Sequence, residues 1–276
     1  MMDTAVEPIE IDLLLEAVFR RYGYDFRSYA RASIERRIRQ FQALNSIATI
    51  ADLIPGVLHD EALFSELART ISVSVTEMFR DPFVYRTLRE KVLPLLRTYP
   101  YFKVWHAGCA TGEEVYSLAI LLREEGLLDR ATIYATDFNE SALARAREGI
   151  YPLDRIQEYT RNYQQAGGTG TLSDHYHARY GSAVLDRKLR KRITFAAHNL
   201  ATDSAFGEIH LVFCRNVFIY FNNELQDHVA RLFLESLIHG GFLCLGTRES
   251  LRFTTVYSAF EELDSRAKLY KKTGAP

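Results

Sequence analysis

The stretch that decides the fold is VWHAGCATGEEVYSLAI, residues 104–120. An apolar run, typical of a buried strand, leads into a turn that contains Gly108 and Gly112, and a helical pattern of apolar residues follows. Glycines in such a turn permit a tight bend and a close approach of the backbone to a ligand. A strand, a glycine turn and a helix in this order therefore predict a ligand site at the turn.

Two glutamates, Glu113 and Glu114, follow the turn directly. A helix N-terminus often binds a phosphate group, but two carboxylates at this position would repel it. They favour a ligand with positive charge instead. Thr111 and Glu114 have the spacing of a capping box, so we expect Thr111 to be the N-cap of the helix. A helix-capping turn with solvated glutamates and no ligand is the alternative that the turn alone leaves open.

Strand-like and helical runs alternate from residue 100 onward. The strand-like runs are FKVWHAG (102–108), ATIYATD (131–137), RITFAAHNL (192–200), EIHLVFCRN (208–216) and GGFLCLGTR (240–248). This alternation predicts a parallel sheet with helices on both faces. Ligands of such sheets bind beyond the carboxyl ends of the strands, at the point where the strand order reverses.

Two regions depart from the alternation. Residues 8–70 have only helical patterns, and residues 162–192 hold a glycine-rich loop and a hairpin that we expect from 176–180 and 183–189. The sequence thus predicts a helical N-terminal domain over 1–72, and a linker with the first helix of the catalytic domain over 73–99. An α/β domain follows over 100–276, with an insertion at about 162–192.

The composition excludes several classes of protein. The chain has 276 residues, a formal net charge of −1 and three cysteines that never fall as CxxC. We therefore expect a cytoplasmic protein without disulfides, structural zinc or a nucleic-acid partner. No apolar run is long enough for a membrane span, so we expect no direct membrane insertion. His175 and His177 flank Tyr176, and we interpret them as surface histidines, with no metal site.

Asp137, at the end of the second strand-like run, restricts the chemical class of the ligand further. An acid at this position accepts hydrogen bonds from ribose hydroxyls in related sheets. The glycines follow the spacing GCATG and not the dinucleotide pattern GxGxxG. S-adenosylmethionine (SAM), whose sulfonium and ammonium groups are cationic, therefore fits better than NAD. The alternative for Asp137 is the N-cap of the helix that follows.

Four motifs in this order resemble those of the CheR-type chemotaxis receptor methyltransferases: SVTEMFRD (74–81), VWHAGCATGEEVYSLAI (104–120), YATDFNESALARAREGIY (134–151) and LVFCRNVFIYF (211–221). The resemblance covers nearly the whole chain. It implies a Rossmann-like class I SAM-dependent methyltransferase domain, an N-terminal all-helical domain and a small inserted antiparallel β hairpin subdomain. It also implies methyl transfer from SAM to glutamate side chains of methyl-accepting chemoreceptors, which gives glutamate 5-O-methyl esters in sensory adaptation.

The resemblance also implies the site residues, to which the turn adds Gly108. The cofactor residues are Ser74, Thr76, Arg80, Gly108, Glu114, Asp137, Asn199, Leu200, Arg215 and Asn216. Arg80 and Tyr220 match positions near the transferred methyl, and we expect both to be catalytic through positioning. Ser74 replaces the usual Asn of the family and Met78 the usual Phe. The alternatives are a surface ion pair of Arg80 with Asp81 or Glu77, and an ordinary packed aromatic at Tyr220.

Two features concern partners. Arginines are dense within residues 20–39, where only Asp25 and Glu35 oppose Arg20, Arg21, Arg27, Arg31, Arg36, Arg37 and Arg39. A solvated helix face is one interpretation. The resemblance implies docking of these helices on the acidic methylation helices of the receptor's cytoplasmic domain by a monomeric enzyme.

The hairpin is the second such feature. In some family members it binds a pentapeptide at the receptor's C-terminus, and those members have a longer, glycine-containing loop. The turn ARYGSAVL (178–185) is shorter, so we expect a pentapeptide-independent enzyme. A SAM-binding regulatory scaffold and a SAM methyltransferase of another protein substrate are the alternatives.

Overall fold

The computed structural model describes residues 6–71 and 76–274, which form two compact units. Unit 1 contains the N-terminal helices and residues 219–228, and unit 2 contains residues 76–218 and 229–274. Ser74 and the predicted boundary between residues 72 and 73 lie outside the described residues.

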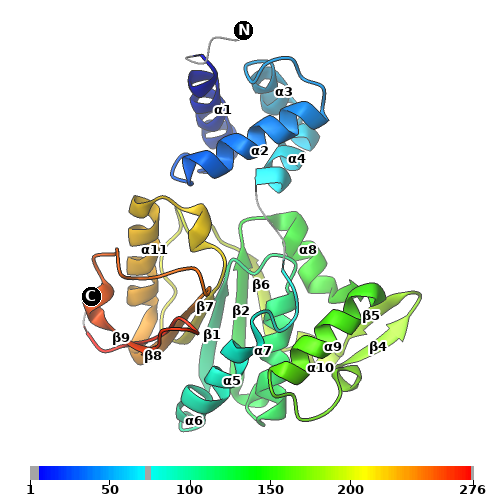
Figure 1. Cartoon of the computed structure of the whole chain (residues 1–276), viewed down its shortest axis with the longest axis vertical. Coiled ribbons are helices and arrows are strands. Elements are labelled where there is room, and N and C mark those ends of the chain that lie inside the picture. Colours follow the sequence, from blue (N-terminus) through cyan, green and yellow to red (C-terminus); the bar gives the residue numbers. More distant parts are fainter. Residues whose placement is uncertain (1–5, 72–75, 275–276) are drawn as a thin grey trace. The chain divides into compact units, whose positions relative to one another are not determined.

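Unit 1 is helical, as predicted. Its helices are α1 (Glu7–Tyr22), α2 (Arg31–Leu44), α3 (Leu53–His59) and α4 (Glu61–Ile71), as Figure 1 shows. Helix α1 ends at Gly23, which adopts the left-handed conformation with φ 76°, a common way to end a helix. Apolar side chains at helical spacing, such as Leu14, Ile38 and Leu67, are fully buried and form the core of this unit.

Unit 2 is built on a seven-stranded sheet of order β6-β2-β1-β7-β8-β10-β9. Five strands are parallel, namely β1 (Phe102–Ala107), β2 (Ala131–Asp137), β6 (Ile193–Ala197), β7 (Ile209–Cys214) and β8 (Leu237–Leu245). These confirm the predicted parallel sheet. The antiparallel pair β9 (Phe260–Asp264) and β10 (Leu269–Lys272) was not predicted, because FEELD and LYKK lack a long apolar run.

Helices cover both faces of this sheet. Trp105 of β1 lies edge-on to Phe233, with ring centroids 5.3 Å apart, while its neighbour Val104 belongs to the core on the other face. Successive residues of a strand point to opposite faces, so β1 contributes to both layers. The helices of this region are α5 (Pro82–Lys91), α6 (Leu93–Leu96), α7 (Glu113–Glu124), α8 (Glu140–Glu148), α9 (Ile156–Gln165), α10 (Arg187–Arg190) and α11 (Asn223–Ser236).

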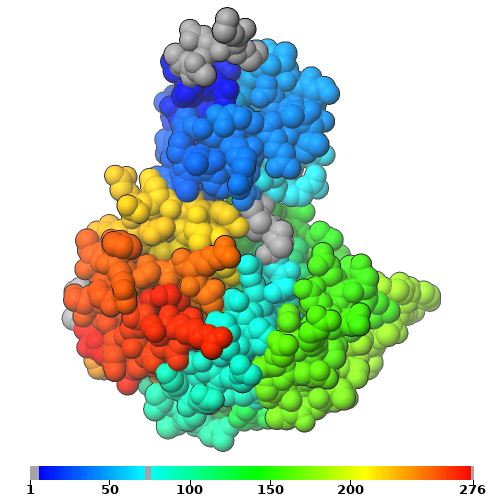
Figure 2. All heavy atoms as spheres, viewed as in Figure 1, coloured from blue at the N-terminus to red at the C-terminus, as the bar shows by residue number. Residues whose placement is uncertain are grey.

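A second, small antiparallel sheet confirms the predicted hairpin subdomain. Its order is β3-β5-β4, formed by β3 (Ile150–Pro152), β5 (Ser182–Leu185) and β4 (Tyr176–Arg179). The hairpin projects from the body of unit 2 in Figures 1 and 2. Its second strand ends earlier than predicted, because residues 187–190 form α10. The third strand, β3, was not predicted.

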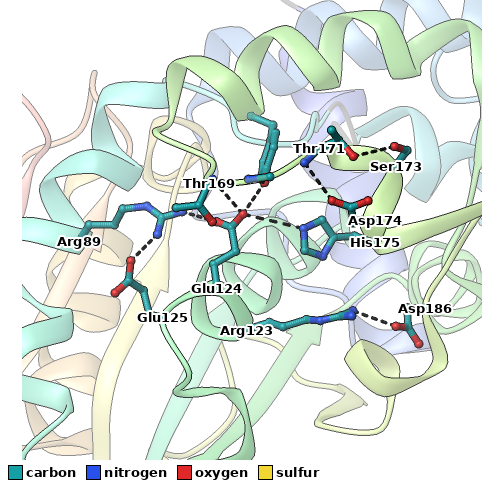
Figure 3. A network of polar contacts seen from close by, with 12 residues as sticks. Arg89, Arg123, Glu124, Glu125, Thr169, Thr171, Ser173, Asp174, His175 and Asp186 are labelled. Atoms are coloured by element: carbon teal, nitrogen blue, oxygen red, sulfur yellow. Dashed lines mark hydrogen bonds and ion pairs between the residues drawn. The ribbon is translucent and has the colours of Figure 1, made fainter.

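A network of polar contacts ties the segment before the hairpin to the body of unit 2 (Figure 3). Glu124 of α7 accepts hydrogen bonds from Arg89 and Tyr163, and from the backbone N–H of Thr169 at 3.2 Å. A ring nitrogen of His175 lies 3.9 Å from the same carboxylate. His175 is 5% exposed, so its interpretation as a surface histidine was wrong.

Candidate active site

The glycine turn lies where the carboxyl ends of β1 and β2 meet. The backbone N–H groups of Gly108 and Cys109 both donate to the Thr136 carbonyl, at 2.8 and 2.9 Å. The N–H of Ala110 donates to the Asp137 carboxylate at 2.8 Å. The turn therefore folds back over the end of β2. Since β1 pairs with β7 on its other side, this is the point where the strand order reverses.

Both glycines of the turn are required by its geometry. Gly108 has φ +72°, and a Cβ there would lie 2.5 Å from a methyl group of Val217. Gly112 has φ +91°, and a Cβ would lie 2.9 Å from that of Ala146. Any side chain would thus strain the backbone and clash with a neighbour.

Asp137 is buried and holds this turn, because its carboxylate accepts from Ala110 and from the N–H of Asn139 at 2.9 Å. The N-cap of α8 is Asn139, whose side chain accepts from the N–H of Ala142. The alternative role of Asp137 as a helix cap was therefore wrong. Burial raises the pKa of Asp137, and the backbone hydrogen bonds oppose this rise. A carboxylate offers about four acceptor positions, so capacity for ribose hydroxyls is left.

The two glutamates after the turn are buried, and this contradicts the alternative of solvated glutamates. Gly112 is the N-cap of α7, without a side-chain hydrogen bond. The expected capping by Thr111 was wrong, because its hydroxyl donates to the Glu113 carboxylate at 2.6 Å. Burial raises the pKa of Glu113 to about 7.

Glu114 forms an ion pair with Arg215, which follows β7. The guanidinium of Arg215 is fully buried, pairs also with Asp81, and donates to the Arg80 carbonyl at 3.0 Å. Burial raises the pKa of Glu114, and the charges of Arg215 and Arg80 oppose this rise. The sequence did not predict that Asp81 belongs to this cluster. The only feature of the sequence that pointed to Asp81 was its position directly after Arg80.

Arg80 lies between two residues with left-handed backbones, Phe79 at φ 54° and Asp81 at φ 53°. The N–H of Phe79 donates to the Ser117 hydroxyl at 2.8 Å, and the Phe79 side chain is fully buried. Non-glycine residues in this conformation cost free energy and collect at functional sites. Among the described residues Arg80 forms no ion pair, because Asp81 pairs with Arg215. The alternative of a surface ion pair between Arg80 and Asp81 or Glu77 was therefore wrong.

Asn216 and Glu249 form the third part of the site. Asn216 has φ 60°, and its N–H donates to the Glu249 carboxylate at 3.1 Å. The same oxygen accepts from the N–H of Gly246, at 2.6 Å. The side-chain oxygen of Asn216 is buried without a hydrogen-bond partner among the described residues. Glu249 was not predicted, because nothing in its own local sequence marks it.

The remaining predicted residues lie in other loops. Asn199 and Leu200 follow β6, and the N–H of His198 donates to the Asp137 carbonyl at 3.1 Å, which brings this loop to the end of β2. Thr76 is half-buried. Tyr220 belongs to unit 1, where the Arg37 guanidinium lies 5.2 Å from its ring centre and its carbonyl accepts from the Ala30 N–H.

These residues suit SAM. Gly108 and Gly112 permit a close approach of a ligand to the turn, and three buried carboxylates stand beside it. The side-chain oxygen of Asn216 is a buried acceptor with no hydrogen-bond partner in the part of the chain that the structure describes. A cationic ligand with ribose hydroxyls satisfies such groups. The strand order and this site at its reversal define a class I SAM-dependent methyltransferase.

Within that class, the chain belongs to the CheR methyltransferase family. The family's all-alpha domain matches residues 9–72, and its SAM binding domain matches residues 74–268. SAM is therefore the cofactor, and the family relates the chain to methylation in chemotaxis. No helix within residues 6–71 and 76–274 is long and apolar enough to cross a membrane.

Similar proteins carry names that agree with this family. A Pseudomonas putida protein named "Putative methyltransferase Cher3" is 52% identical, over 96% of this chain and 97% of its own. A chemotaxis protein methyltransferase of Listeria monocytogenes is 31% identical, over 85% of this chain and 87% of its own. Chemotaxis protein methyltransferase 1 of Vibrio cholerae is 30% identical, over 82% of each chain.

Proposed function

We propose that the chain transfers a methyl group from SAM to glutamate side chains of methyl-accepting chemoreceptors, forming glutamate 5-O-methyl esters. The observation that carries the proposal is Arg80. It is a cation without an ion pair among the described residues, on a strained loop beside the Glu114–Arg215 pair. A guanidinium presented in this way suits a substrate carboxylate.

The chemistry needs positioning more than proton transfer. A glutamate carboxylate is ionised near neutral pH, so it attacks without a general base. SAM supplies an electrophilic methyl group when it is bound. Attack joins a negative and a positive centre and removes both charges, so exclusion of water favours the transition state over the separated ions. Arg80 orients the attacking oxygen, and Tyr220 is proposed to pack against or hydrogen-bond to the reacting groups.

The cofactor is proposed to lie along the carboxyl edge of the sheet. Asp137 would accept the ribose hydroxyls, Asn199 and Leu200 would flank the adenine, and Glu114 with Asn216 would face the cationic methionine part. Ser74, Thr76 and Arg80 would border it on the side of the linker. Arg215 already contacts Glu114 and Asp81, which favours a role in fixing these groups over direct cofactor contact.

The partner is proposed to be the cytoplasmic part of a chemoreceptor, which would place the enzyme in the cytoplasm, as a monomer. Acidic methylation helices would dock on the arginines of unit 1. The hairpin turn supports pentapeptide independence, since only Tyr180 and Gly181 separate β4 from β5, at φ 47° and 72°. Such a turn leaves no long loop to hold a receptor C-terminus. A receptor fragment without its C-terminal pentapeptide should be methylated as fast as the complete fragment.

The direct test is transfer of labelled methyl from SAM to receptor cytoplasmic fragments of the same organism. We expect base-labile label on glutamate, and its loss by about a hundredfold in Arg80→Ala. Arg86→Ala is the matched control, because Arg86 is an exposed arginine of the neighbouring helix α5. Full activity of Arg80→Ala would refute the assigned site. No label on any receptor, with SAM still bound in calorimetry, would favour a regulatory scaffold or another protein substrate.

A further inference from the structure

Unit 2 has a basic pocket at the C-terminal end of α7, the helix that begins at the glycine turn. Its volume is about 480 Å³, and it is lined by Arg123, Gly126, Leu128, Asp129, Lys188, Lys191 and Arg192. We propose that this pocket is a second ligand site, which binds a compact anion with two or more phosphoryl groups, such as pyrophosphate or a nucleoside diphosphate.

The charges in the pocket are unbalanced. Four of its lining side chains are cationic and one, Asp129, is anionic. Asp129 pairs with Arg192 at 2.8 Å, but its side chain is 92% exposed, so water screens this pair strongly. Lys188 and Lys191 are exposed and have no ion pair among the described residues. A multiply charged anion would therefore gain contacts that the protein does not supply itself.

The local fold directs these cations to one place. The segment RKLRKR, residues 187–192, begins with the helical turn α10. Leu189 anchors the turn, because its side chain is fully buried. Lys188 and Lys191 stand three residues apart, which places them on the same side of a helical turn. Gly126 adopts φ +67° and has no side chain to fill the opposite wall.

The shape favours a small ligand over a macromolecule. The volume lies in the range of small-molecule sites, which is about 300–1,000 Å³. A protein partner would need roughly 800 Å² of surface on each side, and a concave basic pocket of this size does not provide that. Ammonium groups together with an arginine fork suit the oxygens of linked phosphoryl groups.

The pocket lies at the amino ends of the parallel strands. Leu128 and Asp129 precede β2, and Arg192 precedes β6, whereas Asp137 and the glycine turn lie at the carboxyl ends. β2 has seven residues, so the two sites are separated by roughly 20 Å at about 3.3 Å per residue. The anion and SAM should therefore bind at the same time.

One edge of the pocket touches the network of Figure 3. Arg123 lines the pocket and pairs with Asp186 at 2.8 Å. The Asp186 side chain also accepts from the Lys188 N–H at 2.8 Å and so caps α10. Asp186 therefore orients Arg123 and the start of α10 without being part of the lining.

Calorimetric titration of the full chain with pyrophosphate and with ADP tests the proposal. We expect binding at one site, and weakening by about tenfold or more in the Lys188→Ala/Lys191→Ala variant. The control is Lys103→Ala/Arg155→Ala, which changes the net charge equally outside the pocket. Tighter binding of ADP than of pyrophosphate would identify a nucleotide, and equal binding a free phosphoryl anion.

Three results would overturn the proposal. One is that neither anion binds at about 50 mM salt, where screening is weak. Another is equal weakening in both double variants, which means non-specific attraction by net charge. The third is loss of anion binding in saturating SAM, which would place the anion in the cofactor site. Equal thermal midpoints of the two variants would show that the loss of binding is not a loss of folding.

Discussion

Arg215 connects two acidic side chains that come from different segments of unit 2. Glu114 lies in the first turn of α7 and Asp81 precedes α5, yet one buried guanidinium pairs with both. A buried charge is tolerated only when its partners compensate for the loss of water. The loop that carries Arg80 and the turn that carries Glu114 are therefore held by a single cation, and neither is expected to move independently.

The first prediction concerns Asp81→Asn. Asparagine tolerates the left-handed backbone of this position, so the change removes the charge and leaves the turn. We expect the free energy of unfolding to fall by about 1–3 kcal/mol, because the buried Arg215 guanidinium loses one of its two carboxylate partners. Methyl transfer should fall by about tenfold, and SAM affinity by less. Urea unfolding and steady-state kinetics measure these effects.

The control for this variant is Asp129→Asn, which removes an exposed ion pair with Arg192. It should change stability by less than about 0.5 kcal/mol. Equal effects of the two substitutions would contradict the role of Asp81 in holding the Arg80 loop.

The buried carboxyl group of Glu113 should make the stability of the fold depend on pH. Burial raises its pKa to about 7 in the folded state, while the unfolded chain loses this proton near its ordinary pKa of about 4.3. Between these values the folded state binds more protons, so the free energy of unfolding falls as pH rises. Glu113→Gln cannot ionise, and it should gain stability relative to the original chain, by up to about 3 kcal/mol between pH 5 and pH 8.

Unfolding curves of both proteins at pH 5, 6, 7 and 8 measure this difference. A constant difference across the series would show that Glu113 ionises as easily in the fold as in the unfolded chain, against its burial.

Among the elements, three loops of the candidate site contain strained backbone. Non-glycine residues with left-handed backbones occur in each of these loops: Ala110 after β1, Asn216 after β7, and Phe79 and Asp81 before α5. A backbone N–H of each loop donates to a buried side chain: Ala110 to Asp137, Asn216 to Glu249, and Phe79 to Ser117. Rigid elements thus fix the site loops in conformations that they would not adopt alone.

Helix α7 supports the segment before the hairpin through Glu124, which gives the prediction at this scale. Glu124→Gln removes a buried charge that accepts from Arg89, Tyr163 and the Thr169 N–H. We expect a loss of about 2–4 kcal/mol in the free energy of unfolding. The matched change Glu125→Gln should cost about 1 kcal/mol or less, since its side chain is 26% exposed and water replaces the charge. Similar losses in urea unfolding would refute a central role for Glu124.

At the scale of the whole molecule, more of the arginines within residues 20–39 form ion pairs than the sequence indicated. The count of opposing acids within residues 20–39 missed Glu7, Asp12 and Glu16, which α1 brings to Arg39, Arg31 and Arg27. Arg37 is engaged by the Thr70 and Ile71 carbonyls. Arg36 is exposed and forms no ion pair among the described residues.

We therefore expect Arg36 to contribute most to receptor docking. Arg36→Ala should raise the KM for a receptor fragment by about threefold to tenfold and leave SAM affinity unchanged. Arg20→Ala is the matched control, because Arg20 is 77% exposed but already pairs with Glu16. The effect of Arg36 should shrink between about 50 and 300 mM salt. A larger effect of Arg20, or no dependence on salt, would count against electrostatic docking.

The sequence by itself determined the order of elements and the centre of the site. Apolar periodicity placed the five parallel strands, GCATG placed the turn, and Asp137 stands at the end of its strand because hydrophobic pattern and glycine chemistry are local signals. Only the tertiary structure decided which side chains meet. Arg215 lies 101 residues from Glu114 and 134 from Asp81, His175 is buried against Glu124, and Glu249 reaches Asn216. Such contacts depend on how the layers pack, and no local pattern records them.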